Sequence, residues 1–324
     1  MLISFDLVPK LWFTLLPFQI GLMKQFFFFL AIFWSVTGFA QTDSTDNVKS
    51  LLWRIEHPEI EQVSYLYGTI HMIDADDFFL TDSTRWAFER SKRATFEINL
   101  EDEMNLFSQL SLMSAMFMDD GLTLQALLSK DEYELVKNHF AQMGMGGFMF
   151  SMMQKIKPMF LTVFASGDVS GGMGGGGVKS YEMELWQMAQ EADMEVAGLE
   201  TAAFQMSVFD SIPYKAQADM LVDAIKMGDA GDDQLEELTK IYLDQDIEAM
   251  VQTIGDDEEG LGQYEEILLN RRNRNWIPVI GEQMRDKPTF FAVGAGHLGG
   301  PNGVIRLLRA EGYILTPMRA PAMP

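Results

Sequence analysis

Two short apolar segments, one near each end of the chain, lead into the same kind of sequence. Val63–Tyr67 and Thr289–Val293 have the length and apolar content of buried strands. Each is followed by a Gly-x-x-His tetrapeptide, Gly68–His71 in the first case and Gly294–His297 in the second. Glycine at a strand end lets the backbone turn sharply and approach a ligand closely. The pattern therefore predicts a site built from distant parts of the chain.

Both tetrapeptides precede a helix-like segment and then a strand-like segment, so each forms the pattern of a βαβ unit. The helix-like segments are Thr84–Arg93 and Val304–Ala310, and the strand-like ones are Ala94–Leu100 and Tyr313–Thr316. If the units pair, their parallel strands place both histidines on one edge of one sheet. We predict an α/β fold with two divergent strand–GxxH–helix–strand units, separated by a large helical insertion over about residues 104–279.

The first forty residues have the pattern of a secretory signal, with Lys24, an apolar run and a small-residue ending at Ala40. We expect cleavage after Ala40, a true start at Met23 and a single domain over residues 41–324. The alternatives are a longer signal or an uncleaved anchor. With the signal removed we expect no stable membrane span and a periplasmic or secreted location.

The composition of the chain restricts the kinds of molecule that it is expected to bind. The formal net charge is −23, which disfavours nucleic acid and anionic membrane surfaces. The chain has no cysteine, so disulfides and thiolate chemistry are excluded. The glycine-rich segment Gly167–Gly177 is predicted to be a loop or lid, because no strand leads into it and no Lys-Ser/Thr pair closes a phosphate loop.

Paired histidines with a carboxylate are a common ligand set for Zn, Mn, Fe or Co. Glu97 is the leading carboxylate, because a lone glutamate in a strand is costly to bury without a partner. The structural alternatives are an exposed Glu97 and hydrogen-bonded core histidines. His71 and His297 share one sequence context, which favours the metal hypothesis, whereas His57 and His139 lack that context and are interpreted as structural.

Two further groups could join such a site. Glu200 follows the short strand-like segment Glu195–Ala197. The run Arg271–Arg274 is unusual in an acidic protein and is either a solvated helix face or a source of groups that hold negative charge on a substrate or tetrahedral intermediate.

These motifs together resemble the TraB/GumN family, which is related to the Tiki metalloproteases. The resemblance spans nearly all of the expected mature chain and rests on six ordered segments: Leu52–Ile55, Tyr65–His71, Phe96–Ile98, Gly198–Thr201, Arg272–Trp276 and Val293–Leu298.

The resemblance implies an α/β fold with a mixed sheet and a metal site formed by His71, His297 and Glu97. Manganese or cobalt is the expected metal, with zinc or iron as alternatives. Glu200 is a further candidate ligand, and Glu97, Arg272 and Asn273 are the candidate catalytic residues, the last two as the groups that hold the oxyanion.

The first functional hypothesis is an exported metal-dependent hydrolase, a peptidase acting on a peptide or secreted protein. The second is a protein of the same fold that binds a peptide signal, haem or iron without turnover. The third is an esterase similar to the erythromycin-inactivating enzymes, whose fold is related.

Overall fold

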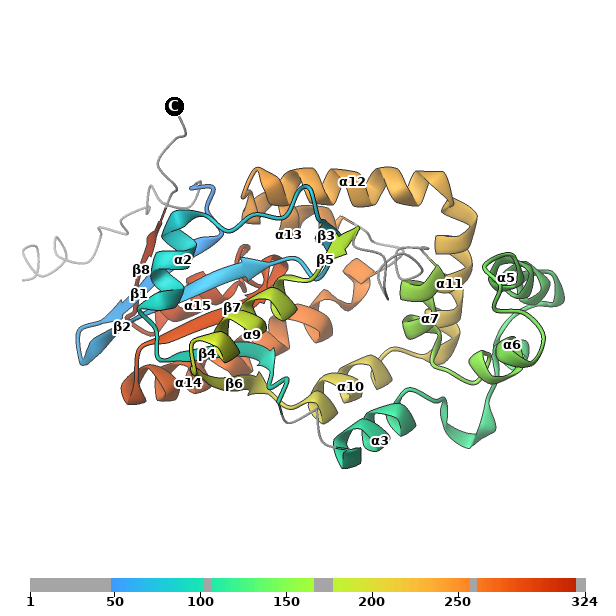
Figure 1. Cartoon of the computed structure of the whole chain (residues 1–324). Coiled ribbons are helices and arrows are strands. Elements are labelled where there is room, and N and C mark those ends of the chain that lie inside the picture. Colours follow the sequence, from blue (N-terminus) through green and yellow to red (C-terminus); the bar gives the residue numbers. More distant parts are fainter. Residues whose placement is uncertain (1–47, 102–105, 166–176, 257–260, 319–324) are drawn as a thin grey trace, which may run out of the picture. The chain divides into compact units, whose positions relative to one another are not determined.

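The core of the protein is a six-stranded mixed sheet with the strand order β6-β4-β7-β2-β1-β8. The strands β6, β4, β7 and β2 are parallel, and β1 is antiparallel to both of its neighbours. β7 comes from near the end of the chain but lies between β2 and β4 from its first half (Figure 1). The bounds are β1 (Leu52–His57), β2 (Ile60–Thr69), β4 (Arg93–Ile98), β6 (Glu195–Glu200), β7 (Thr289–Gly294) and β8 (Ile314–Pro317).

The computed structural model describes residues 48–101, 106–165, 177–256 and 261–318, which belong to one compact unit. The expected signal over residues 1–40 and nearly all of the glycine-rich segment Gly167–Gly177 lie outside the described residues. Among the described residues, no helix combines the length and hydropathy needed to cross a bilayer.

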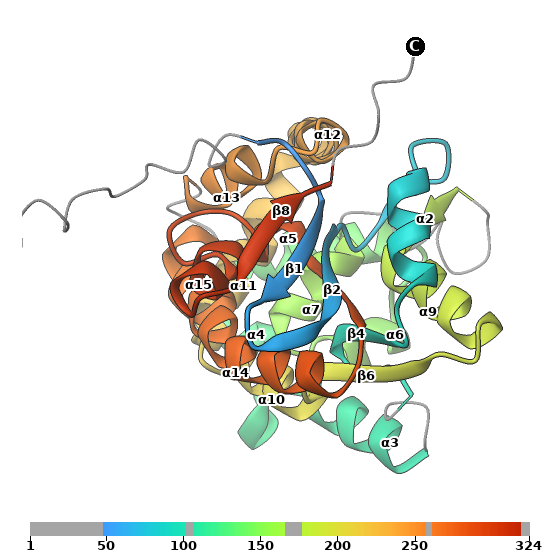
Figure 2. The ribbon, with the colours of Figure 1, turned by 90° about the vertical axis from the view of Figure 1, so that its left-hand side faces the viewer.

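Helices cover both faces of the sheet (Figure 2). The helices α2 (Asp82–Glu89) and α9 (Tyr181–Glu191) pack on one face, and α14 (Arg271–Asp286) packs on the other, beside α15 (Val304–Ala310). Side chains of a strand alternate between faces. Tyr67 accordingly packs against Tyr181 of α9 in the buried core.

A second buried core lies among the helices α4, α5, α6, α7 and α11. It forms where apolar positions recur at helical spacing, with Val136 and Phe140 of α5 four residues apart on the buried face. The bounds of these helices and of the other helices are α3 (Leu106–Ala115), α4 (Leu124–Leu127), α5 (Lys130–Gln142), α6 (Phe148–Met153), α7 (Pro158–Ala165), α10 (Ala202–Asp210), α11 (Tyr214–Met227), α12 (Asp229–Leu243) and α13 (Ile247–Gly255).

The predicted α/β class and mixed sheet are confirmed. The first GxxH strand, β2, pairs in parallel with the second, β7, with Thr69 opposite Gly294. The segment expected to be mostly helical does consist mostly of helices. The short strand expected at Glu195–Ala197 is β6, which extends to Glu200 and joins the main sheet. The segment also contributes β5 (Val178–Lys179), which pairs with β3 (Ile73–Asp74). Short irregular helices, η3 (Leu261–Tyr264), η4 (Glu266–Asn270) and η5 (Ala295–His297), lie close to the ends of α14 and β7.

Candidate active site

Four parallel strands bring the sequence-predicted residues to one edge of the sheet. Glu97 lies one residue before the end of β4, and Glu200 is the last residue of β6. His71 follows the end of β2 by two residues, and His297 ends η5 directly after β7. Because carboxyl ends of parallel strands share one edge, the histidines and carboxylates come from the side of the sheet where ligands bind in α/β proteins.

Arg272 is the centre of a buried cluster at this edge. Its Nη2 donates to Glu97 Oε2 at 2.5 Å and to Glu200 Oε1 at 2.7 Å, and its Nε donates to Glu200 Oε1 at 2.9 Å. Its Nη1 donates to the carbonyl of Leu268 at 3.1 Å and lies 3.2 Å from His297 Nε2. The five N–H groups of the guanidinium therefore all have partners.

Arg272 is also packed by α14 itself, since its guanidinium carbon lies 4.9 Å from the ring centre of Trp276, one turn along the helix. Trp276 Nε1 donates to Glu200 Oε2 at 2.9 Å. Both carboxylate oxygens of Glu200 are thus engaged within the protein. This geometry makes Arg272 a clamp for two carboxylates, and its expected role at an oxyanion stays a prediction.

His297 is buried and has a defined tautomer. Its Nδ1 lies 2.6 Å from Asn273 Oδ1, while the Nδ2 group of Asn273 donates to the carbonyl of Asn302 at 2.9 Å. The amide oxygen can only accept, so Nδ1 carries the proton and Nε2 keeps its lone pair. Burial lowers the pKa of His297 to about 3, so the ring is neutral at physiological pH. Asn273 therefore positions His297.

Glu97 is ionised despite its burial. Burial opposes ionisation, but positive charge on His297 when protonated and on Arg272 lowers the pKa of Glu97 to about 2. Its Oε1 accepts from the backbone N–H of Gly294 at 2.9 Å and lies 3.7 Å from His297 Nε2. A Cβ at position 294 would lie 3.3 Å from this oxygen, which explains the glycine of the second GxxH tetrapeptide. Gln205 also donates to Glu97 Oε2 at 3.2 Å.

His71 differs from His297 in exposure and in partner. Its side chain is 77% exposed, against 5% for His297. Its Nδ1 lies 3.3 Å from Glu182 Oε1, and this hydrogen bond raises the pKa of His71 above its usual value. The charge of His71 still contributes to lowering the pKa of Glu97, although His71 has no direct contact with the Arg272 cluster among the interactions of the described residues.

The structure thus brings Glu97, Glu200, Arg272, Asn273 and His297 into direct contact and places His71 nearby, bonded to Glu182. Sequence reasoning missed Glu182 and Gln205, because neither lies in a motif. A weak signal existed for the α14 residues: Arg272, Asn273 and Trp276 share one helix face by their spacing of three and four residues.

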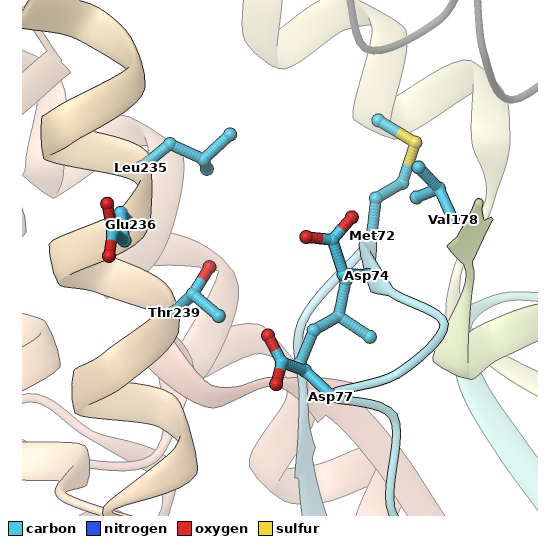
Figure 3. A pocket seen from close by; sticks show the side chains of 8 residues that line it. Met72, Asp74, Asp77, Val178, Leu235, Glu236 and Thr239 are labelled. Atoms are coloured by element: carbon cyan, nitrogen blue, oxygen red, sulfur yellow. The ribbon is translucent and has the colours of Figure 1, made fainter.

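A pocket of about 380 Å³ lies between α12 and the β3–β5 pair (Figure 3). One of the residues that line it, Met72, directly follows His71 in the sequence. Asp74, Asp77 and Glu236 give it an acidic lining. Its remaining walls are Met72, Ile73, Val178, Leu235 and Thr239. The pocket is open to solvent beside the strand end that carries His71.

The side chains near Glu97 carry the types of donor atom that divalent metals bind. His297 Nε2 carries a lone pair, which faces Arg272 Nη1 at 3.2 Å, Glu97 is an ionised carboxylate, and a second imidazole lies at the neighbouring strand end. The arrangement is incomplete as it stands, because no group of three or more His, Asp or Glu side chains among the described residues could hold a metal ion. His71, the third expected ligand, pairs with Glu182 and makes no direct contact with Glu97 among the interactions of the described residues.

The fold and its centre define an α/β protein with a buried histidine–carboxylate–arginine cluster at the carboxyl edge of its sheet. The chain belongs to the TraB/PrgY/gumN family, whose family model matches residues 51–317.

Curated relatives share low identity with it. Metalloprotease TIKI2 of Danio rerio is 23% identical over 319 residues, which cover 83% of this chain and 61% of the relative. Metalloprotease TIKI1 of Homo sapiens is 24% identical over 315 residues, which cover 82% of this chain and 61% of the relative. The chain therefore matches less than two thirds of the length of these relatives.

Proposed function

We propose that this protein is an exported metal-dependent hydrolase that cleaves a peptide or a secreted protein. The observation that carries the proposal is the approach of His297 Nε2 to Glu97 Oε1, at 3.7 Å, in a buried centre where the contact of Nδ1 with Asn273 leaves the lone pair of the ring on Nε2. Family membership and relatives named as metalloproteases support it.

In this proposal His297, Glu97 and His71 hold the metal, with manganese or cobalt expected. A bound divalent metal would supply a water of lowered pKa and polarise the scissile carbonyl. The contact between His297 Nε2 and Arg272 Nη1 has to be given up for His297 to act as a ligand.

The chain's own residues have distinct tasks. Arg272 holds Glu97 and Glu200 close together, since it is hydrogen-bonded to both. Asn273 fixes the ring of His297, and the N–H of Gly294 fixes Oε1 of Glu97. Glu97 either ligates the metal or accepts a proton from the attacking water. The pocket beside His71 is the proposed place for substrate side chains.

Two measurements on the purified protein test this proposal. Metal content is determined by mass spectrometry after reconstitution with Mn, Co, Zn or Fe, and cleavage of a peptide library is followed with and without chelator. We expect near-stoichiometric metal and chelator-sensitive cleavage, both lost in His71→Ala and His297→Ala.

His57→Gln is the matched control. His57 is the last residue of β1, which is antiparallel to β2, so it lies at the edge of the sheet opposite to the site. Its ring packs on that of Tyr313, with 4.7 Å between the ring centres. Metal content and cleavage should therefore be unchanged in this variant. Absence of retained metal and of products under all four metals would refute the proposal. Tight peptide binding without products, insensitive to chelator, would favour the non-catalytic binding protein instead.

A further inference from the structure

Glu182 holds His71 through a chain of contacts that begins in the central sheet. Thr69, the last residue of β2, is buried and donates from Oγ1 to Glu182 Oε1 at 2.7 Å. The same oxygen lies 3.3 Å from Nδ1 of His71, two residues beyond Thr69. Ser180, the N-cap of α9, donates to Glu182 Oε2 at 3.1 Å. The carboxylate is therefore fixed from both sides.

The place of Glu182 in α9 suits a fixed negative charge. It is the second residue of the helix, where unpaired backbone N–H groups and the helix dipole favour an anion. Its side chain is only 20% exposed, whereas the His71 side chain is 77% exposed. A largely exposed imidazole has several rotamers open to it, and one immobile acceptor selects among them.

The two GxxH histidines are held in the same way by different partners. Asn273 Oδ1 lies 2.6 Å from Nδ1 of His297, and Glu182 Oε1 lies 3.3 Å from Nδ1 of His71. In both rings Nε2 is the nitrogen left for a ligand. A histidine that binds metal through one nitrogen commonly donates its other N–H to a carboxylate or carbonyl oxygen, which sets the ring orientation and strengthens the ligand.

We infer that Glu182 is a positioning residue that holds the ring of His71 through Nδ1 and leaves Nε2 as the nitrogen that binds the metal, and that this role is separate from direct ligation. Both of its carboxylate oxygens already have protein partners, which makes it an orienting group. The inference rests on the proposed metal-dependent function. It adds that the two histidines are unequal ligands, one supported by a carboxylate and the other by an amide.

The affinity of the full chain for Mn²⁺ and Co²⁺, measured by calorimetry or by competition with a chelating dye, tests the inference. Glu182→Ala should weaken affinity by about 10- to 100-fold, the usual effect of losing such an orienting partner. Glu182→Gln keeps an oxygen that can accept from Nδ1 and should lose less. Glu184→Gln is the matched control, because Glu184 lies on the same first turn of α9 but pairs with Lys179 at 3.1 Å; its affinity should equal that of the parent.

A spectroscopic readout separates positioning from a general structural effect. In the Zn²⁺-loaded, ¹⁵N-histidine-labelled protein, long-range ¹H–¹⁵N spectra should show His71 with a protonated Nδ1 and a metal-bound Nε2. That Nδ1 proton should be absent or exchange-broadened in Glu182→Ala, with the His297 signals unchanged. Circular dichroism confirms the fold, and Glu182→Gln, which preserves side-chain volume, serves if Glu182→Ala does not fold.

The outcomes separate the inference from the proposed function. If the parent binds metal and Glu182→Ala and Glu182→Gln bind it equally well, or if His71 binds through Nδ1, the inference is overturned while the metal-dependent function stands. If the parent binds none of these metals, the proposed function is refuted and the inference falls with it.

Discussion

Removal of the Arg272 guanidinium should destabilise the metal-free protein strongly. Glu97 Oε2 and Glu200 Oε1 both accept from Nη2, at 2.5 and 2.7 Å. Without that cation, two buried carboxylates face each other about 5 Å apart, and their repulsion is about 3 kcal/mol at an effective dielectric constant near 20. Arg272→Met should therefore lower the free energy of unfolding by about 3–5 kcal/mol, the usual cost of removing one partner from a buried ion pair.

The assay is urea unfolding at 25 °C in the presence of chelator, followed by circular dichroism and tryptophan fluorescence. Arg274→Met is the matched control: Arg274 lies on the same helix and pairs with Glu266, but both side chains are largely exposed, so the loss should be below about 1 kcal/mol. Adding Glu200→Gln to Arg272→Met removes one of the stranded charges and should recover about 1–3 kcal/mol. A loss below about 1 kcal/mol for Arg272→Met, or strictly additive losses in the double variant, would refute the reasoning.

Three further predictions concern stability. Phe140→Ala, in the core formed by α4–α7 and α11, should cost about 3–5 kcal/mol in urea unfolding, and an unchanged midpoint would contradict the packing. Gly303→Ala should lower the melting temperature, because a Cβ there would lie 2.0 Å from the carbonyl oxygen of Gly299; Gly121→Ala, where no atom lies within 4 Å but φ is +68°, should show only the smaller cost of backbone strain. The hydrogen bond from Lys287 lowers the pKa of Glu195, and the hydrogen bond from Arg93 lowers the pKa of Asp286. Both carboxylates therefore stabilise the fold at pH values above their unfolded pKa values, which are about 4. This contribution is lost as the pH falls through their pKa values in the folded protein. Glu195→Gln/Asp286→Asn should therefore be less stable than the parent at pH 7 and equal to it near pH 2; a constant difference in melting temperature across this range would contradict the assignment.

The elements that carry their own periodic signal were predictable from the sequence. Val304–Ala310 is a helix with the expected bounds, and the strand segments around both GxxH tetrapeptides are strands that pair in parallel. The strand predicted over Ala94–Leu100 begins one residue earlier and ends at Ile98, so Glu97 lies closer to the strand end than the pattern indicated. Local apolar spacing determines these elements, but their order does not follow from it, because β7 lies between β2 and β4 and therefore separates two strands that are joined by one helix.

The contacts within the site could not be obtained in the same way. In the run Arg271–Arg274 only Arg272 and Asn273 are buried, because α14 turns these two toward the sheet and leaves the flanking arginines exposed. The sequence did not distinguish the buried His297 from the exposed His71, since their tetrapeptides are alike. Glu182 lies 111 positions after His71, outside any motif, and only tertiary structure places it beside the ring. The expectation that His57 is structural agrees with its packing on Tyr313.

The insertion of β7 between β2 and β4 has a consequence for how the protein is made. A chain that has been synthesised only as far as α14 has β2 and β4 but lacks the strand that joins them. Both strands then present unpaired backbone groups, a state prone to wrong pairing with other chains. Since β7 also leads into His297 and supplies the N–H of Gly294, a fragment lacking it also lacks part of the proposed site. The proposed site is therefore complete only when one of the last segments to be synthesised closes the middle of the sheet.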